Sequence, residues 1–316
     1  MSSSVSGSKI LSFGHYQPSR ILTNDDLAQM VDTNDEWIQS RVGIKERRIA
    51  DGESVADMAA LAAEKALAAS GLSATDIDLI VVATCSNSDR SPNTACRVAA
   101  KLGIGAPAAF DLNTACSGFS YALANADHAI KAGASKNALV IGVEKLSEIT
   151  DWSDRSTCVI FGDGAGAAVV TAISEGEEPG IGPVVWGSDP SEAIAIEGWR
   201  PYIVQEGQKV FRWATTAVPA IALAACQKAG VEPAELGGFV PHQANLRIIE
   251  PLARKIGVNP DVLARDIVES GNTSAASIPL ALSKMIERGE VKSGASVLLV
   301  GFGGGLTYAG QVIRCP

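Results

Sequence analysis

Apolar runs alternate with alanine-rich amphipathic segments along this 316-residue chain, and the alternation restricts the fold to the α/β class. The clearest helix is predicted at 55–70, where apolar residues recur three and four positions apart and Gly71 supplies a stop. Further helices are predicted at 93–102, 117–132, 215–229, 247–256 and 278–288. Strands are predicted at 77–85, 108–112, 138–143, 158–161, 165–171, 238–240, 296–300 and 307–314.

The two parts of the chain are organised alike. A segment rich in glycine, glutamate and proline at 175–182 separates a predicted first half, 1–174, from a predicted second half, 175–316. In each half a strand runs into a glycine-containing turn, at 110–117 in the first and at 298–306 in the second. This repetition indicates a duplicated fold.

Composition and charge exclude several classes of protein. Hydrophobic residues make up 47% of the chain, enough for a large core, and the net charge of −9 argues against a general nucleic-acid binder. We expect no signal peptide and no membrane span, because the sequence has neither a basic leader nor a long uncharged apolar run. Six cysteines without paired spacing, and no HExxH motif, predict neither a disulfide framework nor a metal site. A reduced, cytoplasmic protein is expected.

Cys116 is the candidate nucleophile. It lies in the segment Phe110–Phe119, where a predicted strand ends and a predicted helix begins. The unpaired N–H groups and the dipole at a helix N-terminus favour a thiolate, so we expect a lowered pKa. The other five cysteines are interpreted as core residues.

His242 and Asn272 follow far downstream, in Pro-His-Gln-Ala-Asn and Ser-Gly-Asn-Thr-Ser contexts. Each alone is also compatible with a structural role, as a satisfied histidine or a turn asparagine. With Cys116 they form a set suited to nucleophilic catalysis. The glycine-rich segment 301–305 follows a strand and could direct a backbone N–H at an oxyanion, or form a tight turn.

The segment Gly162–Ala167 matches the dinucleotide pattern G-x-G-x-x-A. That pattern must open a helix, whereas the residues that follow here predict a strand. We therefore interpret the glycines as a bend associated with paired strands.

Together these motifs resemble the β-ketoacyl-acyl carrier protein synthase III family, the initiating condensing enzymes of type II fatty acid synthesis. The similarity runs nearly end to end and includes 31–38, 110–119, 161–167, 241–245, 271–277 and 301–305. The resemblance implies a thiolase-like α/β fold, with duplicated halves in a five-layer αβαβα sandwich, and a homodimer. It implies no cofactor and no metal, since acyl-CoA and malonyl-acyl carrier protein are substrates.

The resemblance also implies roles for individual residues. Cys116 would accept the acyl primer as a thioester, with the backbone N–H groups of Cys116 and Gly304 as the oxyanion hole. His242 and Asn272 would hold the enolate formed when the malonyl group loses CO2. Phe302 would form an apolar wall near the departing carboxylate.

Binding sites for both substrates follow from the same resemblance. Trp37 and Arg155 would sandwich the adenine of CoA, Arg41 would contact a phosphate, and Asn245 the pantetheine. Trp37 could instead belong to the core, and the two arginines could be solvated surface charges. The acyl carrier protein would dock on a basic patch; its members are Arg212, Arg247, Arg254 and Lys255. Ser91 stands near a position where some relatives carry phenylalanine, which predicts a roomier primer pocket for branched or longer acyl groups.

Three alternatives remain at this point. The nearest is a pathway-specific starter synthase or acyltransferase of polyketide biosynthesis with the same fold. A papain-like hydrolase would use the same residue types, but its signature around the cysteine is missing. A non-catalytic binding protein is disfavoured by the intact Cys116, His242 and Asn272. The sequence leaves open the preferred primer, the pathway and any feedback regulation.

Overall fold

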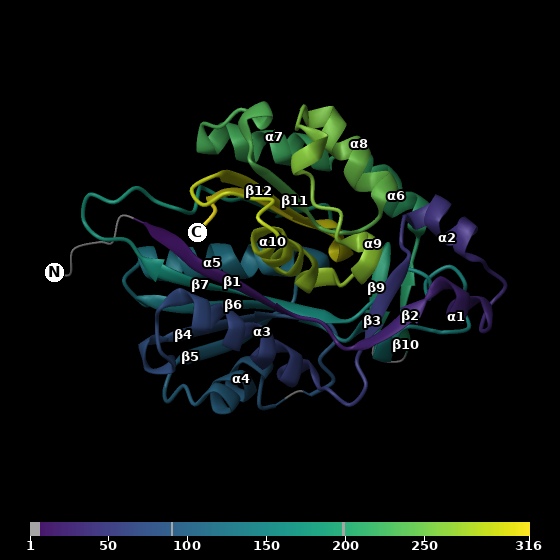
Figure 1. The fold of residues 1–316 in the computed structure, drawn as a ribbon, viewed down its shortest axis with the longest axis horizontal. Coiled ribbons are helices and arrows are strands. Elements are labelled where there is room, and N and C mark those ends of the chain that lie inside the picture. Colours follow the sequence, from purple (N-terminus) through teal and green to yellow (C-terminus); the bar gives the residue numbers. More distant parts are fainter. Residues whose placement is uncertain (1–6, 90, 198–199) are drawn as a thin grey trace.

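The computed structural model describes residues 7–89, 91–197 and 200–316, and they form a layered α/β body (Figure 1). Among these residues there are two principal sheets. The first has the order β1-β7-β6-β4-β5; its strands are β1 (Ser8–Tyr16), β4 (Leu79–Ala83), β5 (Ala108–Leu112), β6 (Asn137–Glu144) and β7 (Gly164–Ala172). The second has the order β11-β12-β13-β8; its strands are β8 (Val185–Ser188), β11 (Gly238–Pro241), β12 (Ser296–Phe302) and β13 (Thr307–Arg314).

Helices separate and cover the two sheets, and side-chain burial shows which faces they contact. The outer face of the first sheet packs on α3 (Val55–Ser70) and α4 (Thr94–Leu102). The two sheets face each other across α5 (Gly118–Lys131) and α10 (Ser277–Glu287). The outer face of the second sheet packs on α7 (Val218–Ala229) and α8 (Leu246–Ile256). This is the expected αβαβα sandwich, and the predicted fold class is confirmed.

The central strands β4, β6, β11 and β12 are buried on both faces, which explains why they read as nearly continuous apolar runs. In β6, Val140 faces the central helices while its neighbours Leu139 and Ile141 face α3 and α4. In β12, Leu299 faces the centre while Leu298 faces α7 and α8. Successive side chains of a strand point to opposite faces, so a strand between two helix layers needs apolar residues at every position.

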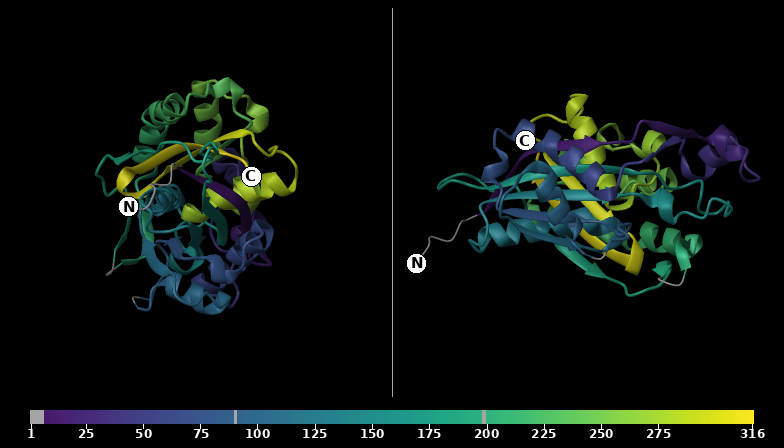
Figure 2. Two further views of the ribbon diagram at one scale, coloured as in Figure 1. Left: turned by 90° about the vertical axis from the view of Figure 1, so that its left-hand side faces the viewer. Right: turned by 90° about the horizontal axis from the view of Figure 1, so that it is seen from below.

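Further elements gather at one end of the layered body, where the views of Figures 1 and 2 agree. They are α1 (Asn24–Ala28), α2 (Asp35–Val42), the paired strands β2 (Arg20–Thr23) and β3 (Glu46–Ile49), the paired strands β9 (Ile194–Glu197) and β10 (Arg200–Gln205), α6 (Gly207–Thr216) and α9 (Ile267–Ser270). The sequence patterns did not predict these short elements, apart from the last residues of α6. No helix within the described parts of the chain combines the length and hydropathy needed to cross a bilayer.

Two predicted elements are wrong. Residues 158–161 form turns rather than a strand, because their carbonyls accept from other segments: Val159 from Arg47 and Ile160 from Asn272. The predicted helix 215–229 is two helices, α6 and α7, that meet at Ala217. Pro219 lies in the first turn of α7 and cannot donate a backbone hydrogen bond, so it begins a helix instead of continuing one.

The prediction for the segment 162–167 is confirmed only in part: the segment leads into a strand and not a helix, with Gly164 and Gly166 in β7, but Gly162 precedes the strand. Because residues 158–161 form no strand, no bend between two paired strands is present here. Gly164 begins β7, which pairs with β1 and β6. A Cβ on Gly166 would lie 2.4 Å from the backbone nitrogen of Leu280 in α10. The glycine therefore permits close packing of a helix on a strand and forms no phosphate loop.

Candidate active site

Cys116, His242 and Asn272 line a common cavity of about 260 Å³. Cys116 lies in the short turn 115–117 just before α5, His242 directly follows β11, and Asn272 lies in the segment between α9 and α10. The carboxyl ends of β5 and β11 thus bring together residues that lie more than a hundred positions apart in the sequence. Phe302 and Gly303, at the end of β12, complete this part of the wall.

Three tight turns around the cavity contain non-glycine residues in the left-handed region. Ala115 precedes Cys116 with φ 46°, Ser274 follows Asn272 with φ 46°, and Leu306 follows Gly304 with φ 45°. Such a conformation costs ~1–3 kcal/mol and persists where the surroundings impose it, most often at functional sites. Ala115 and Ser274 stand in equivalent places just before the two central helices, α5 and α10, which is what a duplicated fold would produce.

Thr307 joins two of these turns. Its Oγ1 lies 3.0 Å from the carbonyl oxygen of Thr114, 2.9 Å from that of Gly304 and 2.8 Å from the hydroxyl of Ser117. The turn that carries Cys116 and the turn that carries Gly304 are therefore held together by hydrogen bonds. This fixes the two backbone N–H groups predicted to form the oxyanion hole relative to each other.

The Cys116 thiol lies beneath the glycine-rich turn. A Cβ on Gly303 would lie 2.5 Å from the Cβ and 2.8 Å from the Sγ of Cys116, so no side chain fits at this glycine. Burial raises the pKa of the Cys116 thiol to about 11, although the Ser274 hydroxyl and the N–H groups of Gly304 and Cys116 act to lower it. The expectation of a lowered pKa is therefore wrong: loss of hydration outweighs the donors that would stabilise a thiolate.

His242 is buried at the carboxyl end of β11. The backbone N–H of His242 donates to the carbonyl of Val300 over 2.8 Å. The imidazole ring stands edge-on to the ring of Phe302, with ring centres 5.4 Å apart. Burial lowers the pKa of His242 to about 3, so the imidazole is neutral at physiological pH. A neutral imidazole carries one N–H and can offer it to a developing negative charge.

The lowered pKa of His242 predicts a loss of stability in mild acid. Its pKa is about 3 in the folded chain but close to 6.5 when unfolded, so protons bind preferentially to the unfolded state as the pH falls below 6.5. At about pH 5 this single group should cost ~2 kcal/mol, at about 1.4 kcal/mol per pH unit. Urea unfolding at about pH 7 and pH 5 should therefore show a larger loss for the wild type than for His242→Gln. An equal loss of unfolding free energy in the two proteins would show that His242 is not buried in its neutral form.

Asn272 is held by its backbone and by its own amide oxygen. The backbone N–H of Asn272 donates to the carbonyl of Ile160 over 2.9 Å, and its backbone carbonyl accepts from the N–H of Gly162 over 3.1 Å. Its Oδ1 accepts from the N–H of Ser274 over 2.9 Å. Because the oxygen is engaged in this turn, the NH2 group of Asn272 is the part of the amide left to act as a donor toward the cavity.

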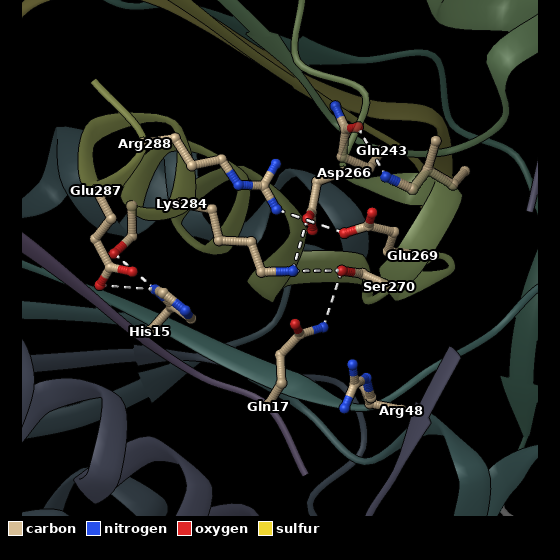
Figure 3. A network of polar contacts seen from close by, with 12 residues as sticks. His15, Gln17, Arg48, Gln243, Asp266, Glu269, Ser270, Lys284, Glu287 and Arg288 are labelled. Atoms are coloured by element: carbon tan, nitrogen blue, oxygen red, sulfur yellow. Dashed lines mark hydrogen bonds and ion pairs between the residues drawn. The ribbon is translucent and has the colours of Figure 1, made fainter. Parts of the chain in front are cut away.

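The segment that precedes Asn272 is fixed from behind by a polar network (Figure 3). Lys284 of α10 donates to Asp266 over 2.7 Å and to Ser270 over 3.0 Å, and Gln17 also donates to Ser270 over 2.9 Å. The Lys284 and Asp266 side chains are only 12% and 6% exposed, so this ion pair is shielded from water. The network anchors α9, whose last residue lies two positions before Asn272.

The predicted CoA-binding residues lie together, in a closed arrangement. The Arg155 guanidinium stands 4.2 Å from the centre of the Trp37 ring, and the Arg41 guanidinium stands 5.9 Å from it. A purine inserted between Trp37 and Arg155 needs about 7 Å, so Arg155 would have to move outward. Asn245 lines the cavity, but it also caps α8 and donates to the carbonyl of Arg41 over 3.2 Å.

The predicted basic patch lies on α6 and α8, beside the cavity. Arg212, Arg247, Arg254 and Lys255 are exposed, and among the described residues none of them forms an ion pair. Arg247 stands 5.8 Å from the ring of Phe211, which lines the cavity. Ser91 is exposed and does not line this cavity, so its place in a primer pocket stays a prediction.

The sequence patterns missed most of the apolar cavity wall. Leu146, Phe161, Ile194 and Ile203 line it together with a second cysteine, Cys85. The Cys85 thiol and N–H both donate to the fully buried Glu144, and burial raises the pKa of this thiol well above its usual value. Nothing in the sequence distinguishes these apolar side chains from core residues.

Comparisons with known proteins show which family this chain resembles. The family model described as 3-oxoacyl-[acyl-carrier-protein (ACP)] synthase III matches residues 110–190, and the model of its C-terminal part matches residues 226–315. Beta-ketoacyl-[acyl-carrier-protein] synthase III 4 of Streptomyces coelicolor is 64% identical over 313 residues, which cover 98% of this chain and 99% of that relative.

Two solved structures are similar over nearly their whole length. The 3-oxoacyl-[acyl-carrier-protein] synthase III of Aquifex aeolicus superposes with a TM-score of 0.94 at 46% identity, covering 98% of this chain and 100% of that one. The priming β-ketosynthase of the R1128 polyketide biosynthetic pathway superposes with a TM-score of 0.95 at 40% identity, covering 98% and 96%.

Proposed function

This chain belongs to the 3-oxoacyl-[acyl-carrier-protein] synthase III family, and we propose that it joins an acyl-CoA primer to malonyl-acyl carrier protein by decarboxylative condensation. It is an acyltransferase, the condensing enzyme that initiates fatty acid synthesis. Cys116, His242 and Asn272, from both halves of the chain, line one cavity. The roles proposed for these residues in the two half-reactions rest on this observation.

In the first half-reaction Cys116 takes the acyl group. Its sulfur attacks the thioester carbonyl of acyl-CoA, the bond to the CoA sulfur breaks, and the thiol proton leaves with CoA. The N–H groups of Cys116 and Gly304, which already act on the thiol, support their role as donors to the intermediate oxyanion. Loss of one such donor typically costs about 3 kcal/mol of transition-state stabilisation.

In the second half-reaction the malonyl group loses CO2. The electron pair of the broken carbon–carbon bond moves onto the thioester oxygen, and the enolate is held by the ring N–H of His242 and the NH2 group of Asn272. Its carbon then attacks the acyl group on Cys116, the bond between the acyl carbon and the Cys116 sulfur breaks, and the released thiolate takes up a proton from solvent to regenerate the thiol. The buried, neutral state of His242 and the engaged oxygen of Asn272 support donor roles for both. The apolar ring of Phe302 next to His242 favours neutral CO2 over the carboxylate.

The binding roles follow the same logic. Trp37 and Arg155 would open to take the adenine between them, Arg41 would contact a phosphate, and Asn245 the pantetheine arm. The apolar wall formed by Leu146, Phe161, Ile194 and Ile203 suits an acyl chain and would receive the primer. No step in this scheme calls for a cofactor.

A homodimer acting in the cytoplasm is also proposed. Strand β5 is the last strand of the first sheet, and Phe110 on it is 40% exposed. An uncovered sheet edge with an exposed aromatic side chain is a ready surface for a second copy. Light scattering of the purified protein measures the mass directly.

Charge reversal in the basic patch should weaken the binding of malonyl-acyl carrier protein and leave the reaction with acyl-CoA unaffected. Arg254→Glu is expected to raise KM for malonyl-acyl carrier protein about tenfold at low salt, because an exposed arginine without an ion pair would face an acidic partner. Acylation of Cys116 by acyl-CoA should be unchanged. Lys292→Glu, an exposed lysine outside the patch, is the matched control. A KM that is unchanged, or equally raised in both variants, would remove the patch from the docking surface.

Mass spectrometry tests the function as a whole. The protein is incubated with acetyl-, isobutyryl- and longer acyl-CoAs, and the peptide containing Cys116 is weighed. Malonyl-acyl carrier protein is then added, and discharge of the adduct should yield 3-oxoacyl-acyl carrier protein and CO2. Absence of an adduct on Cys116, or discharge by hydrolysis, would overturn the proposal. Exclusive use of acetyl-CoA would overturn the roomier pocket predicted from Ser91.

A polyketide starter synthase is the second candidate, favoured by the similarity to the R1128 priming β-ketosynthase. Its chemistry at Cys116 would be the same, so the carrier protein decides between the two. Comparing kcat/KM with carrier proteins from fatty acid and polyketide synthesis distinguishes them. A pure acyltransferase would release no CO2 with either.

A further inference from the structure

Ser277 lies directly behind His242. It is the first residue of α10, its side chain is buried, and it does not line the cavity. Its hydroxyl oxygen is 2.8 Å from Nδ1 of His242. The other ring nitrogen, Nε2, is on the far side of the imidazole from this contact, and His242 lines the cavity.

The direction of this hydrogen bond follows from counting donors and acceptors. The Ser277 oxygen already accepts from the N–H of Gln243 over 3.3 Å. Among the described residues, Nδ1 of His242 is the only acceptor within hydrogen-bond distance of this hydroxyl. If Nδ1 carried the proton, the buried Ser277 hydrogen would have no partner, which is costly.

We propose that Ser277 sets the tautomer of His242: the serine donates to Nδ1, so the single imidazole proton sits on Nε2 and faces the cavity. Ser277 is thus a positioning residue for condensation. The inference rests on the proposed role of His242 as an enolate donor.

Two contacts of Gln243 keep the serine oxygen in place. The side chain of Gln243 donates to the carbonyl of Pro241 over 2.8 Å. Its amide oxygen accepts from the N–H of Ile267 over 3.2 Å (Figure 3). Gln243 is almost completely buried. The turn after β11 is therefore tied to α9, while Ser277 ties the same turn to α10. Because Asn272 lies between α9 and α10, these contacts also fix the spacing of the two proposed enolate donors.

The assignment restricts what His242 can do. An Nε2 that carries a proton can donate to an enolate oxygen, but it cannot accept the proton of the Cys116 thiol. Acyl transfer to Cys116 should then proceed without a histidine base, and a defect at Ser277 should affect condensation while sparing transfer. A merely structural serine would affect both steps alike.

Nitrogen-15 NMR of histidine-labelled protein reads the tautomer directly, because the chain has only three histidines. The wild type should show His242 protonated on Nε2 at neutral pH, with the signal assigned by its absence in His242→Gln. In Ser277→Ala the two tautomers should mix, and condensation should slow about tenfold while the rate of Cys116 acylation stays within about twofold. Ser277→Thr keeps the hydroxyl and should restore both the Nε2 signal and the rate.

Each outcome decides the matter. A wild-type spectrum with the proton on Nδ1 overturns the inference even if no variant folds. An unmixed Nε2 signal in Ser277→Ala with unchanged condensation also overturns it. If instead the wild-type tautomer is as expected but His242→Gln leaves decarboxylation intact, the proposed role of His242 fails and the tautomer assignment stands.

Discussion

Replacing Cys116 with alanine is expected to abolish acyl transfer, with a loss of at least about 10⁴-fold in the rate of acyl-enzyme formation. In the proposed mechanism the sulfur forms the covalent bond to the primer, and alanine offers no nucleophile in its place. Cys85, the other thiol in the cavity, donates to the buried carboxylate of Glu144 and has a strongly raised pKa. The measurement is the mass of the protein after incubation with acyl-CoA.

The control for this variant is Cys85→Ala, which should still form the adduct on Cys116. Malonyl-acyl carrier protein provides a second control, because His242 and Asn272 are untouched in Cys116→Ala. Decarboxylation of the malonyl group should therefore continue without condensation. An acyl adduct that persists in Cys116→Ala would show that the nucleophile is misassigned.

The layered fold was predictable because its strands are buried on both faces. β6 and β12 are apolar throughout their interiors, at 138–143 and 297–302, and the helices between and outside the sheets are alanine-rich, so the alternation is visible in the sequence. The turns at 158–161 were mistaken for a strand because they are equally apolar. Their backbone is paired with Arg47 and Asn272, which are distant in sequence, and periodicity cannot reveal such partners.

The state of the Cys116 thiol was not predictable from its neighbours in sequence. Its place before α5 indicates donors that favour a thiolate, and such donors are present. Its burial depends on Gly303 and Ser274, which reach it from the other half of the chain. The resting thiol is therefore protonated. In the proposed mechanism the donors act on the oxyanion that forms from the thioester carbonyl.

The supporting residues of the site were hidden for a related reason. Ser277 and Thr307 are small polar residues at the start of a helix and a strand, where such residues commonly serve as caps or turn formers. Ser277 contacts His242, and Thr307 contacts two separate tight turns. Sequence motifs predict the reacting groups, whereas the contacts that orient them become visible only in the fold.

Replacing His242 with alanine should slow decarboxylation and spare acylation of Cys116, whereas Cys116→Ala should abolish acylation and spare decarboxylation. Decarboxylation of malonyl-acyl carrier protein is expected to fall about 10²–10³-fold, the usual loss when one preorganised donor to an oxyanion is removed. Acylation of Cys116 should retain most of its rate, since a neutral His242 with a pKa of about 3 is a poor base for the thiol. Release of labelled CO2 and the mass of the acyl-enzyme measure the two steps separately.

Two further variants make this test specific. Asn272→Ala removes the other proposed donor and should also slow decarboxylation, and the double variant should lose less than the product of the two single losses, because both donors act on the same oxygen. His128→Gln changes an exposed histidine of α5 away from the cavity and should leave both steps intact. Equal losses of acylation and decarboxylation in His242→Ala would mean that His242 also takes the thiol proton. That result would require Nε2 to be free of a proton in the resting enzyme, so it would also contradict the tautomer proposed for Ser277 and His242.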